Sequence, residues 1–398
     1  MLALRRSRMA AAPAFLRGGF RSFFFGGAAW AVIALGLWLC ALAGALDLSS
    51  LFDPLTWHRH EMLFGFVGAV IAGFLLTAIP NWTGRLPIAG LPLAALFGLW
   101  VAARGAVLFS ATVGPVLAAA LDVGFYVVLA ALAAREVLAA KNLNLPIVGL
   151  VLLFGAANAA DHAGAAGLLA DPDVGIRAAM SLVIVMISLI GGRIIPSFTR
   201  NWMTKQGMKN RLPGQPTRYD LVTLAATGIA LLAWVATPES RSAGALLLVA
   251  GVFQAGRLAR WGGWRAVSDP LVFILHVGYA WIPVGLLLLG GSLFDAAIPR
   301  SVPVHAFTAG AMATMILAVM TRATLGHTGR ELRANWPTVL IYLLITLGAV
   351  LRLATPFGFI DYTLGMRLAA LLWGGAFLTF LAVYGPILFS HRLGDPTK

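Results

Sequence analysis

The sequence predicts an all-α protein, a polytopic bundle of about 12 helices that cross a membrane. Of its 398 residues, 60% are hydrophobic and 11% are charged, whereas soluble domains are about half apolar and about a quarter charged. The apolar residues gather in runs long enough to span a bilayer. The 44 glycines and 20 prolines favour helices packed through small residues over a β-barrel, whose strands would alternate polar and apolar positions.

Twelve apolar stretches are predicted to be transmembrane helices. They cover residues 24–46, 60–79, 90–110, 113–134, 145–165, 176–196, 219–236, 243–259, 270–291, 303–321, 337–354 and 364–388. Residues 1–23 are then a basic arm, residues 24–390 a single transmembrane domain, and residues 391–398 a charged tail. The first apolar run is too long for a signal peptide and shows no clear cleavage site, so we expect it to be a helix.

The net charge of +14 reflects topology and not a nucleic-acid partner. With the N-terminus inside, 22 of the 29 lysines and arginines lie on the cytoplasmic side. The other side keeps seven: Arg59, Arg104, Arg177, Arg241, Arg300, Arg352 and Arg367. This asymmetry follows the positive-inside rule and predicts that both termini are cytoplasmic.

One segment occurs twice. Residues 60–85 and 305–330 each begin with a histidine, His60 or His305, and carry a glycine five residues later. Each ends in Thr-Gly-Arg, at 83–85 and at 328–330. Both copies are apolar stretches long enough to cross a bilayer, with an imidazole at the entrance.

A weaker middle copy begins at Ile176, which stands where the other copies have histidine. It is identified by aligning Pro196-Ser197-Phe198-Thr199 with Pro80-Asn81-Trp82-Thr83. The copies fall in predicted helices 2, 6 and 10, which favours a pseudo-threefold arrangement of four-helix groups. The alternative is that any two membrane helices resemble each other.

Four histidines are predicted at the outer ends of helices: His58, His60, His162 and His305. Ionisable groups near a bilayer are costly and usually functional, and neutral imidazole is a ligand for haem and copper. We expect His60 and His305 to be axial ligands of a haem. His58 and His162 are candidates for an outer metal site that holds copper or a second haem. The alternatives are an interfacial role for His58 and a packing role for His162.

Neighbouring charges suggest supporting roles in this outer group. Arg59 is a candidate partner of a haem propionate, and Glu61 or Asp161 is placed to orient an imidazole through its second nitrogen.

Several other residues are weaker candidates. His276 and Tyr279 lie one helical turn apart and suit a proton path, a quinol contact or a second metal, with a satisfied buried pair as the alternative. His327 is either part of such a second site or a helix-end residue. With Asp161 and Tyr279, Arg193 and Arg322 are candidates for proton transfer or for binding quinol or an anionic group.

The sequence contains no phosphate loop, Ser-His-Asp arrangement or pair of carboxylates at catalytic spacing, so nothing supports hydrolysis. The single cysteine, Cys40, excludes an intramolecular disulfide and a multi-thiolate cluster.

Three polar motifs, taken in order, resemble the signature of the NnrS family. They are Trp57–Phe66 with Ala78–Arg85, Gly191–Trp202, and Met320–Arg330. The resemblance spans nearly the whole chain. It implies a bacterial inner-membrane protein with haem, of the b type, and copper, associated with nitric oxide, nitrosative stress and denitrification.

The three-times-four plan is also similar to the catalytic subunit of haem-copper oxidases and nitric oxide reductases. In those proteins, histidines of helices 2 and 10 hold a low-spin haem, and His60 and His305 would take these places. The similarity does not extend to the copper ligands, because predicted helices 6 and 7 lack histidine here and predicted helix 10 has only His305. An ordinary binuclear centre is therefore not expected.

Three functions follow as hypotheses. The first is a haem-dependent oxidoreductase that reduces nitric oxide near the periplasmic side, with quinol as electron donor. The second is a non-catalytic haem or copper protein that senses nitric oxide or protects other metal centres. The third is a transporter, which the division into thirds disfavours because carriers usually show two six-helix halves.

Overall fold

The computed structural model describes residues 11–394, which form helices and loops without a strand. Twelve helical segments are long and apolar enough to cross a membrane, which confirms the predicted fold class. They are α2 (Gly19–Leu42), α3–η2–α4 (Pro54–Thr83), α5 (Leu91–Leu108), α7 (Pro115–Ala139), α8 (Leu145–Ala165), α9 (Val174–Lys205), α10 (Arg218–Ala236), α11 (Arg241–Ala259), α12 (Pro270–Ser292), α13–η4–α14 (Ser301–His327), α15–η5 (Trp336–Phe357) and α16 (Tyr362–Phe389).

The first helix begins at Gly19, earlier than the expected 24, so it includes residues assigned to the basic arm. The reason is Arg21, which is buried in the helix and not solvated with the arm. Its guanidinium donates hydrogen bonds to the carbonyls of Leu388 and Ser390 at 2.8 and 2.6 Å. A cation placed on the last carbonyls of a helix is stabilising.

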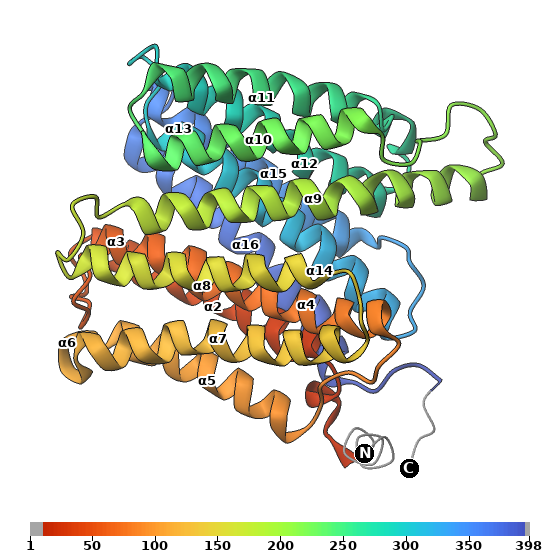
Figure 1. Ribbon diagram of the computed structural model, residues 1–398, viewed down its shortest axis with the longest axis horizontal. Helices are drawn as coiled ribbons and strands as arrows, with labels where there is room; N and C mark the ends of the chain where they lie inside the picture. Colours follow the sequence, from red (N-terminus) through yellow and green to blue (C-terminus); the bar gives the residue numbers. More distant parts are fainter. Residues whose placement is uncertain (1–10, 395–398) are drawn as a thin grey trace. The chain divides into compact units, whose positions relative to one another are not determined.

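The chain divides into two compact units. Unit 1 comprises residues 1–179, 323–330 and 380–398, and unit 2 comprises residues 180–322 and 331–379. Within unit 1, α2 packs on α4, and α7 packs on both α5 and α8 (Figure 1). Within unit 2, α11 packs between α10 and α12, and α12 and α15 pack on η4. The single domain and its pseudo-threefold grouping stay predictions.

The repeated segment has the same unusual helix in both outer copies. Directly after His60 the α-helix changes to a π-helix, η2 (Glu61–Val67), and directly after His305 it changes to η4 (Ala306–Met312). Short π-helical segments are rare and occur frequently at functional sites. The similarity of the two sequences therefore extends to a local backbone geometry.

The Thr-Gly-Arg signature marks the end of a helix. Gly84 and Gly329 adopt left-handed φ angles of 67° and 75°, which only glycine does without strain. The threonine hydroxyls donate to the carbonyl four residues earlier, from Thr83 to Ile79 at 2.7 Å and from Thr328 to Thr324 at 2.6 Å.

The middle copy shares one of these features. Thr199, the counterpart of Thr83, donates to the Ile195 carbonyl at 2.8 Å. No glycine follows it, and α9 continues to Lys205.

Replacing Gly84 with alanine should destabilise the protein by about 1–2 kcal/mol, because the left-handed backbone strains an L-residue. Gly98 is the matched control, since an added Cβ there also meets no atom within 4 Å but the residue lies inside α5. Thermal unfolding in detergent should show a lower midpoint for Gly84→Ala alone. Equal midpoints would refute the helix-end account.

Candidate functional site

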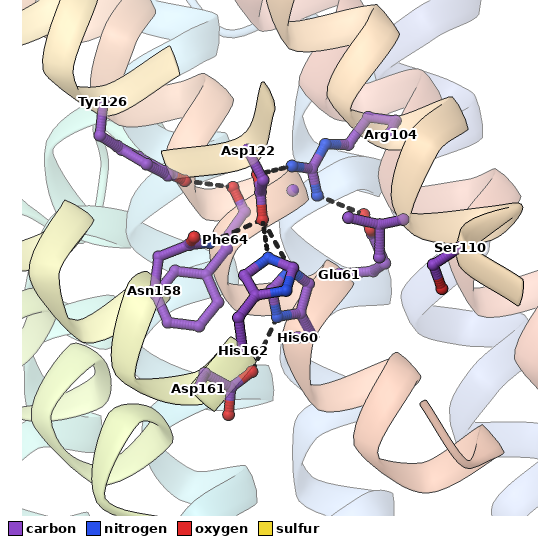
Figure 2. A network of polar contacts seen from close by, with 12 residues as sticks. His60, Glu61, Phe64, Arg104, Ser110, Asp122, Tyr126, Asn158, Asp161 and His162 are labelled. Atoms are coloured by element: carbon purple, nitrogen blue, oxygen red, sulfur yellow. Dashed lines mark hydrogen bonds and ion pairs between the residues drawn. The ribbon is translucent and has the colours of Figure 1, made fainter. Parts of the chain in front are cut away.

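Three helices of unit 1 bring His60, Asp122 and His162 together. One ligand atom from each residue lies within 4.8 Å of the other two. His60 Nε2 is 2.8 Å and His162 Nε2 is 3.1 Å from the same oxygen, Asp122 Oδ2. His60 and Asp122 are fully buried (Figure 2). We name these three residues the His-Asp-His group.

Helix α8 presents three polar side chains to this group. Asn158, Asp161 and His162 have the spacing i, i+3 and i+4, which places them on one helix face. Asn158 donates to Asp122 Oδ2 at 2.7 Å, and Asp161 Oδ2 lies 2.7 Å from His60 Nδ1. His60 therefore has a carboxylate at each ring nitrogen, which fixes the orientation of its imidazole.

A single arginine compensates part of the buried negative charge. Arg104 of α5 pairs with Asp122 Oδ1 and, at 2.7 Å, with Glu61 Oε2. Trp30 Nε1 also donates to Glu61 Oε2, at 2.6 Å. The site thus contains three carboxylates, those of Glu61, Asp122 and Asp161, and one guanidinium.

The π-helix η2 is held by side chains of neighbouring helices. Trp100 Nε1 donates to the Gly65 carbonyl at 3.0 Å, and the Tyr126 hydroxyl donates to the Phe64 carbonyl at 2.5 Å. A Cβ on Gly65 would lie 2.3 Å from Glu61 Oε2 and 2.9 Å from Arg104 Nη1. The glycine after the histidine is therefore required because the ion pair occupies that space.

Aromatic rings close the site. The rings of Phe52 and Phe64 lie 4.9 and 5.0 Å from that of His60, and Phe52 also contacts His162. Because these rings exclude water, the electrostatic interactions inside are strong.

The other outer candidates have different surroundings. Glu61 contacts Arg104 and Trp30, and Asp161 is the carboxylate that contacts His60. Arg59 forms an ion pair with Asp173 at 2.9 Å. The His58 ring stacks on the Trp38 ring, with 4.0 Å between the ring centroids. His58 lies on the same helix as His60 but is not part of the His-Asp-His group.

His305 lies in unit 2, whereas His60 lies in unit 1. Its Nδ1 donates to the Ser301 carbonyl at 2.7 Å. This bond fixes the tautomer and leaves the Nε2 lone pair for a ligand. A haem shared by His60 and His305 stays a prediction.

His276 and Tyr279 of unit 2 have separate partners. His276 Nε2 donates to Thr199 Oγ1 at 2.8 Å. The Tyr279 hydroxyl donates to Gln254 at 2.6 Å and accepts from Arg257 at 3.0 Å. Their network also includes the buried ion pair between Arg257 and Asp220, at 2.8 Å.

Three further candidates, Arg322, Arg193 and His327, belong neither to the His-Asp-His group nor to the hydrogen-bond network of Tyr279. Arg322 stacks over the Phe198 ring at 4.1 Å, and Arg193 is exposed. His327 belongs to unit 1, where its ring contacts Phe20.

Sequence reasoning missed Asp122 and Asn158 and treated Arg104 only as an outer charge. A signal was present, because Asp122 and Arg104 each interrupt an apolar span and such residues usually pair within a bundle. Which residues they pair with depends on helix packing.

The fold and this group define a polytopic helical membrane protein with a buried set of metal-ligating side chains. The family model described as NnrS protein matches residues 14–392, nearly the whole chain. The chain therefore belongs to the NnrS family, and this membership supports a role in the nitric oxide response. No curated protein matches the chain.

Replacing Arg104 with glutamine should destabilise the protein by about 3–5 kcal/mol, because two buried carboxylates lose their cation. The exposed Arg367 provides the control, and its glutamine variant should unfold like the wild type. Denaturant unfolding in detergent gives both values. Similar stability of the two variants would contradict the role assigned to Arg104.

Proposed function

We propose that the chain is a metal-containing membrane protein that binds nitric oxide, and that His60, Asp122 and His162 hold the metal ion. One observation carries the proposal. Three ligand atoms from three helices converge within 4.8 Å, and two of the three residues, His60 and Asp122, are fully buried.

Charge balance supports a divalent cation at this position. With neutral imidazoles, the carboxylates of Glu61, Asp122 and Asp161 exceed the Arg104 charge by two. Uncompensated buried charge costs several kcal/mol per ion. A divalent ion supplies the missing charge; without it, two protons bound by the imidazoles or the carboxylates would have to supply it.

The chemistry of the donor set indicates the type of metal. Two imidazoles and one carboxylate suit a first-row transition metal such as copper or iron. An axial haem ligand needs one imidazole nitrogen directed at the iron, whereas both nitrogens of His60 contact carboxylates. The set around His60 therefore fits a small ion better than a haem. His305 keeps a lone pair for the haem that we expect in this family.

The residues around the ligands would each have a defined task. Asp161 holds the His60 ring through Nδ1, and Asn158 fixes the Asp122 oxygen that faces the imidazoles. Arg104 binds the other Asp122 oxygen and keeps that carboxylate charged. Phe52 and Phe64 exclude water. When bound, a redox-active ion supplies an open coordination position for nitric oxide.

A membrane-embedded site of this kind suits a small uncharged gas that dissolves in the bilayer. In the catalytic form of the proposal, quinol supplies two electrons and two protons, and two nitric oxide molecules become one nitrous oxide and one water. In the non-catalytic form the protein binds nitric oxide as a sensor or a protector. The buried, closed site is compatible with both.

We also propose that the chain lies in the bacterial inner membrane with both termini in the cytoplasm. The distribution of lysine and arginine supports this orientation. In this orientation the His-Asp-His group, to which α3 contributes its last residue, would lie towards the periplasm.

Purified protein should contain about one transition-metal ion per chain in addition to any haem iron, and His60→Ala, His162→Ala and Asp122→Asn should each lose this ion because each removes a ligand. Asp161→Asn should weaken binding about 10–100-fold, as is usual when a residue that orients a ligand is lost. Elemental mass spectrometry with metal titration measures both effects.

Two variants serve as controls for the metal measurement. His391→Ala alters an exposed histidine of the tail and should keep the metal. His305→Ala should keep the metal while losing any haem absorption. Full metal content in both His60→Ala and His162→Ala would overturn the proposed site.

Continuous consumption of nitric oxide distinguishes the catalytic form of the proposed function from the non-catalytic form. Reconstituted protein given quinol should consume nitric oxide continuously if it is a reductase, with one nitrous oxide formed per quinol oxidised. A sensor or protector should take up nitric oxide once, in proportion to its metal content. Uptake that His162→Ala leaves unchanged would contradict both forms.

A further inference from the structure

The two outer copies of the repeated segment have opposite charge surroundings. Around His60, three carboxylates face one arginine. The position after His60 is Glu61, whereas the position after His305 is Ala306. The copy in unit 1 therefore attracts a cation, whereas the ring of His305 bonds a backbone carbonyl and no described carboxylate.

The charge beside His305 is that of Arg352. Helix α15, which carries this arginine, packs on both α13, which ends in His305, and η4, which follows it. Arg352 forms no ion pair with any described residue, and its Nη1 is buried without a hydrogen-bond partner. A buried N–H donor without an acceptor is costly.

A second donor, on another helix that packs against η4, also lacks an acceptor. The Trp281 indole of α12 lies against Gly310, where an added Cβ would be 2.7 Å from the ring. Its Nε1 is buried and unpaired. Buried polar groups are nearly always hydrogen-bonded, so two orphaned donors around one short segment indicate acceptors that come from outside the protein.

We propose that Arg352, together with His305 and Trp281, forms a binding site for an anionic group, a carboxylate or a phosphate. Guanidinium is the side chain best suited to bind both. The His305 Nε2 lone pair adds an acceptor that can ligate a metal carried by the same molecule. The site belongs to unit 2 and does not depend on the metal proposed for the His-Asp-His group.

Two sources of the anion can be distinguished by direct binding. In one arm, delipidated protein in uncharged detergent is titrated with haem and with haem dimethyl ester, whose carboxylates are blocked, and binding is read from absorption. In the other arm, nanodiscs of phosphatidylglycerol or of phosphatidylcholine are compared by the lipid that the protein retains in native mass spectrometry.

Arg352→Gln should weaken binding of the anionic probe about tenfold or more, because a charge-assisted hydrogen bond is lost. Arg352→Lys should retain most of the binding and shows that the fold is intact. Arg367→Gln, an exposed arginine of α16, should match the wild type. If Arg352→Gln weakens the binding of haem but not of its dimethyl ester, the anion is a carboxylate. If Arg352→Gln lowers the amount of retained phosphatidylglycerol, the anion is a lipid phosphate.

Equal binding of both anionic probes by wild type and Arg352→Gln would overturn the proposal. It would also be overturned if Arg367→Gln weakened binding as much as Arg352→Gln, since the effect would then be one of general surface charge.

Discussion

Placing three carboxylates inside an apolar helix bundle is the constraint on which the rest of unit 1 depends. Asp122 is the central group, because one of its oxygens lies 2.8 and 3.1 Å from two imidazole nitrogens and accepts from the Asn158 amide, and the other pairs with Arg104. Its four partners come from three other helices, so these contacts tie α3, α5, α7 and α8 together. The remaining negative charge supports our proposal that the site binds a cation.

The repeated segment shows how one backbone design can serve two chemistries. Both copies place a histidine before a π-helix and end in a left-handed glycine. What differs is the charge that neighbouring helices bring: Asp122, Asp161 and Arg104 beside His60, but Arg352 beside His305. The backbone is therefore alike in the two copies, and we propose that the packed helices determine what each imidazole binds.

The fold could be predicted from the sequence because hydropathy over about 20 residues is a local property. All 12 spans occur in the predicted order, and α2 differs because Arg21 is buried against α16. The site was predictable only in part. His60, His162 and Asp161 stand out as polar residues at helix ends. Two facts depend on how helices distant in sequence pack together. One is that Asp122 joins these residues, and the other is that Arg104 forms an ion pair with it, where the sequence alone showed only a charge on the outer side.

X-ray absorption at the edge of the bound metal tests the central claim most directly. For purified wild-type protein the account predicts nitrogen and oxygen ligands at about 2.0–2.2 Å, with outer-shell scattering from two imidazoles. That scattering should fall to one imidazole in any His162→Ala protein that still holds metal. A spectrum without imidazole scattering, or one that His162→Ala and His60→Ala both leave unchanged, would contradict it.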